Sequence, residues 1–263
     1  MLDQNLDKGW MLLKSVIDKK TILDMKKFLN LRTKIEFKNA ERWFKISNIK
    51  ISNRGSLKKK YSEYQKLLPF LKKKMPSDLQ HFLVGEYGLK TRLSNKILNI
   101  LCSKNLHNAL SKVLNLNKIY IHYPPMVRFN FGSKKSHVPS HQDHAYNCHL
   151  KDFITVWVPV TKIDQNCPGL IVYNKSHSKI KKLKHTSDSF WSNRISNLNG
   201  LKGHHVEMNI GDILIFSKNL IHKSAKNFGK KVRYSFDLRF FSEPEHTTKS
   251  YLDLQSKKII RKH

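Results

Sequence analysis

Two histidines and an aspartate stand close together in the segment SHQDHAYN at residues 140–147. In an extended segment, residues i and i+2 point to the same side, so His141 and Asp143 present an imidazole and a carboxylate together. This pair could supply two ligands of a 2-His-1-carboxylate facial triad, the arrangement that non-haem iron(II) oxygenases use. The chain has 14 histidines, so an HxD triplet arises easily by chance. A third ligand from a distant strand must distinguish a metal site from a surface loop.

The C-terminal third offers such a ligand in GDILIFSKNLIHKSAKNFGKKVRYSFDLRF, residues 211–240. Gly211 and Asp212 predict a turn, the apolar run after them predicts a buried strand, and His222 comes at its far end. Arg233 follows eleven residues later, on the next expected strand. An arginine fork is suited to binding a carboxylate through two hydrogen bonds. A 2-oxoglutarate co-substrate would chelate iron at one end and need such a clamp at the other.

These segments together resemble the phytanoyl-CoA dioxygenase family of iron(II)/2-oxoglutarate oxygenases. GWMLLKSVIDKKTI at residues 9–22 also resembles the opening strand and first helix of the family, whereas residues 30–115 match it only loosely. The matching pieces are HQDHAYN at 141–147, ITVWVPVTKID at 154–164, GLIVYNKSH at 169–177, GDILIF at 211–216, and His222, Ser224 and Arg233.

The resemblance implies a jelly-roll core of the double-stranded β-helix type, with O2 as a second co-substrate. It assigns His141, Asp143 and His222 to iron(II), and Arg233 with Ser224 to the distal carboxylate of 2-oxoglutarate. Two further contacts to 2-oxoglutarate are expected from the RFN segment at 128–130, namely Arg128 and Asn130. For Arg128 the alternative is a cation at a strand edge, facing solvent.

Several residues near these motifs are candidates for substrate contact. Arg239 shares a strand face with Arg233, so it either pairs with Asp237 or is itself the clamp for 2-oxoglutarate; the spacing from His222 favours Arg233. Trp157 is either a core residue or a platform for substrate, and His177 is equally suited to a structural role. The residues expected to line the substrate side directly after the HxD motif are His144, Tyr146 and Asn147.

Two positions bear on the reaction and the substrate. The carboxylate at Asp143 disfavours halogenation, because halogenating relatives carry a small residue there. Lys223 stands where relatives commonly have glycine, and it either indicates an acidic substrate or faces water.

The elements that must position these residues change character near Lys118. Residues 1–117 predict a mostly helical layer, with apolar residues at helical spacing in 21–30, 61–73 and 105–116. Residues 118–243 contain short β-branched and aromatic segments separated by Gly or Pro, which predict the jelly-roll catalytic core. Residues 244–263 predict a loose basic tail. We therefore expect one mainly β domain with helices (α+β), in which the helical layer packs on the core.

Composition bears on where the protein is expected to reside and on what it binds. The 263 residues include three cysteines without metal-ligand spacing, and no segment predicts a signal peptide or a membrane span. A cytoplasmic protein is expected, with an option of peripheral contact at the inner face of a membrane. The formal net charge of +31 favours an anionic partner, unless it reflects AT-rich codons that enrich Lys, Asn and Ile together.

The expected function is hydroxylation of a C–H bond in an anionic small molecule. One alternative is an oxygenase at an anionic membrane surface that acts on a lipid-linked acidic glycan. The least favoured alternative is a catalytically silent jelly roll that binds nucleic acid, because such a module has no need of the spacing between His222 and Arg233.

Overall fold

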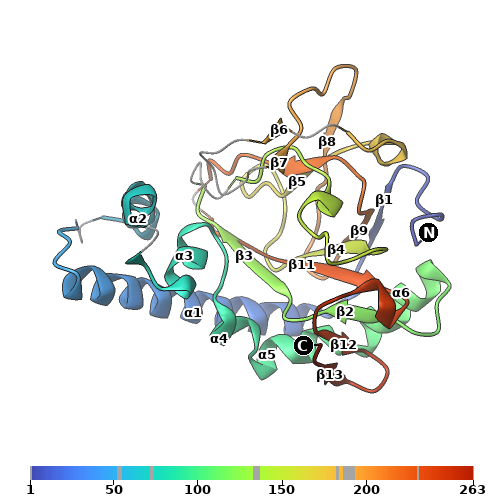
Figure 1. Cartoon of the computed structure of the whole chain (residues 1–263), viewed down its shortest axis with the longest axis horizontal. Coiled ribbons are helices and arrows are strands. Elements are labelled where there is room, and N and C mark those ends of the chain that lie inside the picture. The colour runs from blue at the N-terminus through green and yellow to red at the C-terminus, as the bar shows by residue number, and fades with distance from the viewer. Residues whose placement is uncertain are drawn as a thin grey trace.

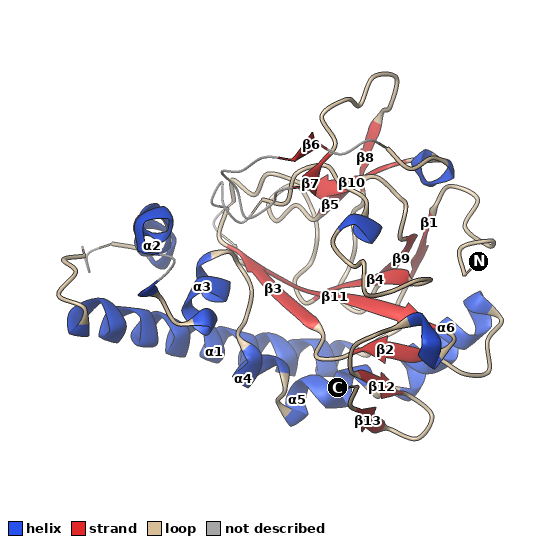
Figure 2. Ribbon diagram, viewed as in Figure 1, coloured by secondary structure: helices blue, strands red, loops and turns tan. Residues whose placement is uncertain are grey.

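The computed structural model describes residues 2–51, 55–71, 74–132, 137–181, 184–185, 193–229 and 231–262. Most of the helices lie on one side of the antiparallel sheets, and loops connect the strands (Figures 1 and 2). The helices are α1 (Lys19–Ile46), α2 (Leu57–Leu71), α3 (Ser77–Leu83), α4 (Leu89–Arg92), α5 (Asn95–Leu101) and α6 (Lys104–Leu114). None of these helices in the described ranges is long and apolar enough to cross a bilayer.

The strands form a large and a small sheet, as in a double-stranded β-helix. The large sheet has the order β1-β9-β4-β11-β2-β12-β13, with β3 also paired to β11, and the small sheet has the order β10-β5-β8. Strands β6 (Lys184–His185) and β7 (Asn193–Arg194) pair with each other and with neither of these sheets. The sheet strands are β1 (Trp10–Leu13), β2 (Tyr120–His122), β3 (Met126–Asn130), β4 (Ile154–Pro159), β5 (Leu170–Tyr173), β8 (Gly203–His205), β9 (Ile213–Ser217), β10 (His222–Ser224), β11 (Arg233–Phe241), β12 (Tyr251–Asp253) and β13 (Lys258–Ile260).

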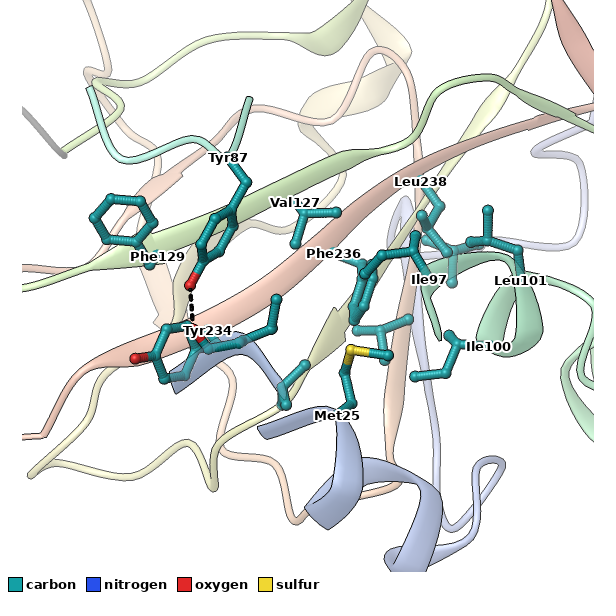
Figure 3. Close-up of a cluster of buried hydrophobic side chains, with 14 of the residues drawn as sticks. Met25, Tyr87, Ile97, Ile100, Leu101, Val127, Phe129, Tyr234, Phe236 and Leu238 are labelled. Atoms are coloured by element: carbon teal, nitrogen blue, oxygen red, sulfur yellow. Dashed lines mark hydrogen bonds between the residues drawn. The ribbon is translucent and has the colours of Figure 1, made fainter. Parts of the chain in front are cut away.

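The helical layer covers the face of the large sheet that points away from the small sheet (Figure 1). Helix α1 begins after Asp18, whose carboxylate accepts a hydrogen bond from the Thr21 amide and caps the first turn. Its buried residues recur every three or four positions from Ile22 to Phe44, so a single face packs on the sheet. Figure 3 shows Met25 of α1 beside Phe236 of β11, within the largest apolar core.

A second apolar core lies between the two sheets and supports the candidate site. Trp157 of β4 and Phe216 of β9 come from the large sheet, and Leu170 and Val172 of β5 come from the small one. Residues on the inner faces of two stacked sheets alternate with residues on the outer faces. The side chains of β11 that face this space are therefore every second residue, starting from Arg233.

The C-terminal segment differs from the expected loose tail. Strands β12 and β13 form a hairpin, and β12 pairs with β2 through Leu252 and Ile121. Leu252 is fully buried. The lysine-rich sequence near the end of the chain suggested a loose tail. In the structure, Tyr251, Leu252 and Asp253 instead form a strand, and the hairpin extends the large sheet.

Helix α2 contains a proline, Pro69. A proline inside a helix removes a backbone hydrogen bond and commonly kinks or ends the helix, yet α2 runs through Pro69 to Leu71. Pro69 lies near the C-terminal end of α2, where the helix has only two described residues left to continue.

Candidate metal centre

The three residues predicted as iron ligands converge in the space between the sheets. His141 and His222 face each other as an antiparallel pair, and each backbone amide donates to the other's carbonyl at 3.0 Å. Asp143 begins a short 3-10 helix (Asp143–Ala145) rather than continuing an extended segment. All three are at least 94% buried, and one ligand atom from each lies within 4.8 Å of the other two.

The donor atoms are oriented for a cation. The Nδ1 atom of His141 lies 2.8 Å from the Pro139 carbonyl oxygen, and Nδ1 of His222 lies 3.0 Å from that of Leu220. A ring nitrogen next to a carbonyl oxygen must carry the proton, so each Nε2 atom keeps its lone pair. The Nε2 atoms of His141 and His222 lie 3.5 and 3.8 Å from Oδ1 of Asp143. These residues fit a metal ion because two imidazole lone pairs and one carboxylate oxygen point into the same space.

The protonation states suit metal binding as well. Burial lowers the pKa of His222 to about 3, and the nearby His141 adds to the effect, so the ring is neutral near pH 7. Burial by itself raises the pKa of Asp143, but Arg239 and the two histidines outweigh it and hold the pKa below its usual range. Neutral imidazoles and an ionised carboxylate are the forms that bind a metal ion.

Both oxygens of Asp143 have protein partners. Oδ1 accepts a hydrogen bond from Nη2 of Arg239 at 3.0 Å, and Oδ2 accepts one from the Thr155 hydroxyl at 2.5 Å. Arg239 on β11 and Thr155 on β4 are directly opposite partners across these two strands. Arg239 therefore contacts the candidate metal ligand, and Asp237, considered as its partner from the sequence, instead lies near Arg128.

A cavity of about 240 Å³ adjoins the three residues, and Arg233 lies in its wall. Arg233 is 5% exposed, and burial lowers its pKa to about 10, so it remains charged near pH 7. Its Nη1 atom donates to the carbonyls of Pro168 and Gly169 at 2.9 and 2.8 Å, and its guanidinium lies 5.9 Å from the Trp157 ring centre. Nη2 lies 3.5 Å from Oγ of Ser224.

Arg128 also lies in the cavity wall rather than at a solvent-exposed edge. Its Nη1 atom lies 3.4 Å from a carboxylate oxygen of Glu86, and its Nε atom lies 3.8 Å from one of Asp237. Burial raises the pKa of Asp237, whereas Glu86 has a lowered pKa because a contact with His81 and the charge of Arg128 outweigh its burial. Arg128 is thus held between two carboxylates at the cavity.

The predicted substrate residues divide into two groups. Tyr146, Asn147 and Trp157 line the cavity, and the Tyr146 ring meets the His141 ring edge-on at 5.2 Å between centres.

Asn130, His144 and His177 are not among the described residues of the cavity wall. Asn130 accepts from the Gly132 amide through Oδ1, and the His177 ring packs against Gly9. Lys223 alternates with the two inward residues of β10 and places its ammonium group 5.7 Å from the Tyr173 ring centre. Lys223 is likewise outside the described wall of the cavity.

Eight of the described wall residues were not among the predicted site residues: Glu86, Met126, Val138, Thr155, Leu170, Phe216, Ser235 and Asp237. Thr155 could have been inferred, because it lies two positions before Trp157 and shares its strand face. Asp237 likewise shares a face with Arg233. Glu86 lies between α3 and α4 and forms an isolated antiparallel bridge with Arg128 of β3, and no pattern in the sequence connects it to the site.

Comparison with known families identifies the chain. The family model described as phytanoyl-CoA dioxygenase matches residues 20–235. The chain belongs to the phytanoyl-CoA dioxygenase family. It is an oxygenase of the iron(II)/2-oxoglutarate class, and the arrangement of His141, Asp143 and His222 fits this chemistry.

Solved structures with the same fold agree with this assignment. The epimerase SnoN from nogalamycin biosynthesis, described as non-haem and α-ketoglutarate-dependent, is 12% identical with a TM-score of 0.53, and the match covers 92% of this chain and 80% of that one. The carbocyclase SnoK from the same biosynthesis is 10% identical with a TM-score of 0.57, covering 91% and 81%. EvdO2 from Micromonospora carbonacea var. aurantiaca, solved with 2-oxoglutarate, is 12% identical with a TM-score of 0.54, covering 93% and 94%. A search of curated protein sequences found no match.

Proposed function

We propose that this oxygenase hydroxylates a C–H bond of a small molecule. The observation that carries the proposal is the convergence of His141, Asp143 and His222 beside a cavity whose wall contains Arg233. Bound iron(II) and 2-oxoglutarate would supply the oxidising chemistry by activating O2 and releasing succinate and CO2. The protein's part is to hold the ligands, orient the co-substrate and keep water out.

The ligand residues leave room for the reactants. His141, Asp143 and His222 would take one face of the metal and leave the opposite positions for 2-oxoglutarate and O2. The carboxylate at Asp143 occupies the position that a halide would need, which supports hydroxylation over halogenation.

We assign the distal carboxylate of 2-oxoglutarate to Arg233 and Ser224. Arg233 is buried, charged and held in the cavity wall by two backbone carbonyls, so its remaining donors are fixed in direction. Arg239 is a weaker candidate for this role because its Nη2 atom is bonded to Asp143. Arg128 is suited to a second contact with the co-substrate from the opposite strand β3.

We assign Tyr146 and Asn147 to the substrate side of the cavity, because both line it and both follow shortly after the metal-binding motif. An anionic substrate remains a prediction from the net charge of +31, as does contact with an anionic membrane surface. Of the arginines in the described cavity wall, Arg128 and Arg239 lie beside carboxylates, and Arg233 is assigned to 2-oxoglutarate. No contact or cavity in the described part of the chain specifically supports the membrane-surface glycan oxygenase or the nucleic-acid-binding module.

The test is aerobic turnover with iron(II), 2-oxoglutarate and a panel of small molecules. A substrate should accelerate succinate formation, and its product should gain one oxygen atom that derives from 18O2. A product without added oxygen would assign the chain to another reaction of this class. Succinate formation that does not require iron would contradict the proposal.

A further inference from the structure

The orientation of the Asp143 carboxylate is controlled by two residues that lie opposite each other in the large sheet. Arg239 of β11 and Thr155 of β4 are cross-strand partners, and each donates to a different oxygen of Asp143. Directly opposite residues in an antiparallel pair have Cβ atoms roughly 4.5–5.5 Å apart on one face of the sheet. The register of β4 with β11 therefore sets the separation of the two donors.

The two oxygens are not equivalent toward the metal position. Oδ1 lies 3.5 and 3.8 Å from the Nε2 atoms of the two histidines, so it is the oxygen that faces the third corner of the site. Oδ2 is turned toward the Thr155 hydroxyl. A carboxylate that is free to rotate can bind a metal through both oxygens, which occupies one more coordination position.

We propose that Arg239 and Thr155 form a two-point clamp that makes Asp143 a ligand through Oδ1 alone. Both are positioning residues, since they act on the metal through Asp143. Holding Oδ2 away from the metal keeps three coordination positions open for a bidentate co-substrate and O2. The inference rests on the proposed metal site and extends it to residues outside the ligand set.

The test compares iron(II) affinity in Thr155→Val, Arg239→Gln and wild-type protein, by anaerobic titration with saturating 2-oxoglutarate. Loss of a partner that orients a ligand typically weakens metal binding by roughly 10–100-fold. We expect a loss in this range for both variants and a shifted visible absorption band of the chelate. Thr155→Ser, which keeps the hydroxyl, should restore most of the affinity.

The charge of Arg239 provides the discriminating outcome. If Arg239 acted only as a cation near the metal, its removal would tighten iron binding, and Thr155→Val would have no effect. Unchanged or tighter binding in both variants would overturn the clamp. If the proposed metal site itself were wrong, the wild-type protein would show no chelate band, which distinguishes that failure from failure of the clamp.

Arg32→Gln is the matched control for folding. Arg32 is also 13% exposed in its side chain and pairs with a carboxylate, that of Glu36, at 2.9 Å, but it lies on α1. The Arg32→Gln variant should lose a similarly buried ion pair, yet keep the iron affinity and the visible absorption band of the wild-type protein. A weakened Arg32→Gln variant with the same shifted band would assign the effect to general destabilisation and overturn the proposal.

Discussion

Single residues carry the chemistry here because their immediate hydrogen bonds decide what they can bind. The Nδ1 atoms of His141 and His222 are committed to backbone carbonyls, and the two Nε2 atoms remain for a metal. The sequence predicted which residues meet, since an HxD motif and a distant histidine with arginine eleven positions later form a specific pattern. It could not predict that Asp143 would begin a 3-10 helix, because that depends on the loop closing against β9 and β10.

Arg233→Ala should weaken 2-oxoglutarate binding by roughly 30-fold or more, since removing one partner of a buried charge pair costs about 2–5 kcal/mol. Arg233→Lys keeps the charge and loses the two-pronged geometry, so it should fall between the alanine variant and the wild type. The measurement is anaerobic titration of the iron-loaded protein with 2-oxoglutarate. Exposed Arg261→Ala serves as the control, and equal affinities for all four proteins would rule out Arg233 as the clamp.

His122 should make the stability of the metal-free protein depend on pH. Burial lowers its pKa from 6.5 to about 3, and His149, 4.6 Å away between ring centres, adds to the effect. Between these pH values the unfolded chain binds a proton at His122 that the folded chain excludes, so the free energy of unfolding falls as the pH falls. In urea titrations at several pH values, His122→Gln should lose less stability on acidification than the wild type, by up to about 1.4 kcal/mol per pH unit. If both proteins lost stability equally on acidification, His122 would not be a source of the pH dependence.

At the scale of elements, the strand register places the site. Strand β11 brings Arg233 next to β3 and Arg239 next to β4, and both side chains face the space between the sheets. Most sheet strands between residues 118 and 243 were predictable from alternating and β-branched segments bounded by Gly and Pro. Which strands would be neighbours was not, because pairing between residues far apart in the chain leaves no local pattern.

The C-terminal hairpin provides a test of an element that the sequence pattern concealed. Leu252 is fully buried against β2, so Leu252→Ala should lower the free energy of unfolding by about 2–5 kcal/mol. Ile259 of the same hairpin is 39% exposed, and Ile259→Ala should change it much less. Urea unfolding followed by circular dichroism measures both variants. A Leu252 variant as stable as the wild type would support the loose tail that the lysine-rich sequence suggested.

At the scale of the whole molecule, charge and fold are separate properties. The net charge of +31 indicates mutual repulsion and attraction for anions, but it does not select a fold or a substrate. The cavity has its own balance, in which Arg128 faces Glu86 and Asp237, and Arg239 faces Asp143. The charge of the surface is therefore a poor guide to the charge that the cavity accepts.

Self-repulsion at this charge should make the protein more stable in salt. Raising sodium chloride from 20 mM to 500 mM shortens the Debye length to roughly a fifth of its value, which screens repulsion between exposed lysines. The melting temperature measured by calorimetry should rise over this range. A falling melting temperature would show that attractive surface pairs outweigh the excess of positive charge.

The central claim is that His141, Asp143 and His222 hold iron in a form that binds 2-oxoglutarate. The most direct measurement is anaerobic addition of iron(II) and 2-oxoglutarate to metal-free protein, recording the visible charge-transfer band of the chelate. The band should appear with the wild type at one iron per chain and be absent with His222→Ala. A wild-type protein that takes up no iron and shows no band would contradict the claim, as would a His222→Ala variant that retains the band unchanged.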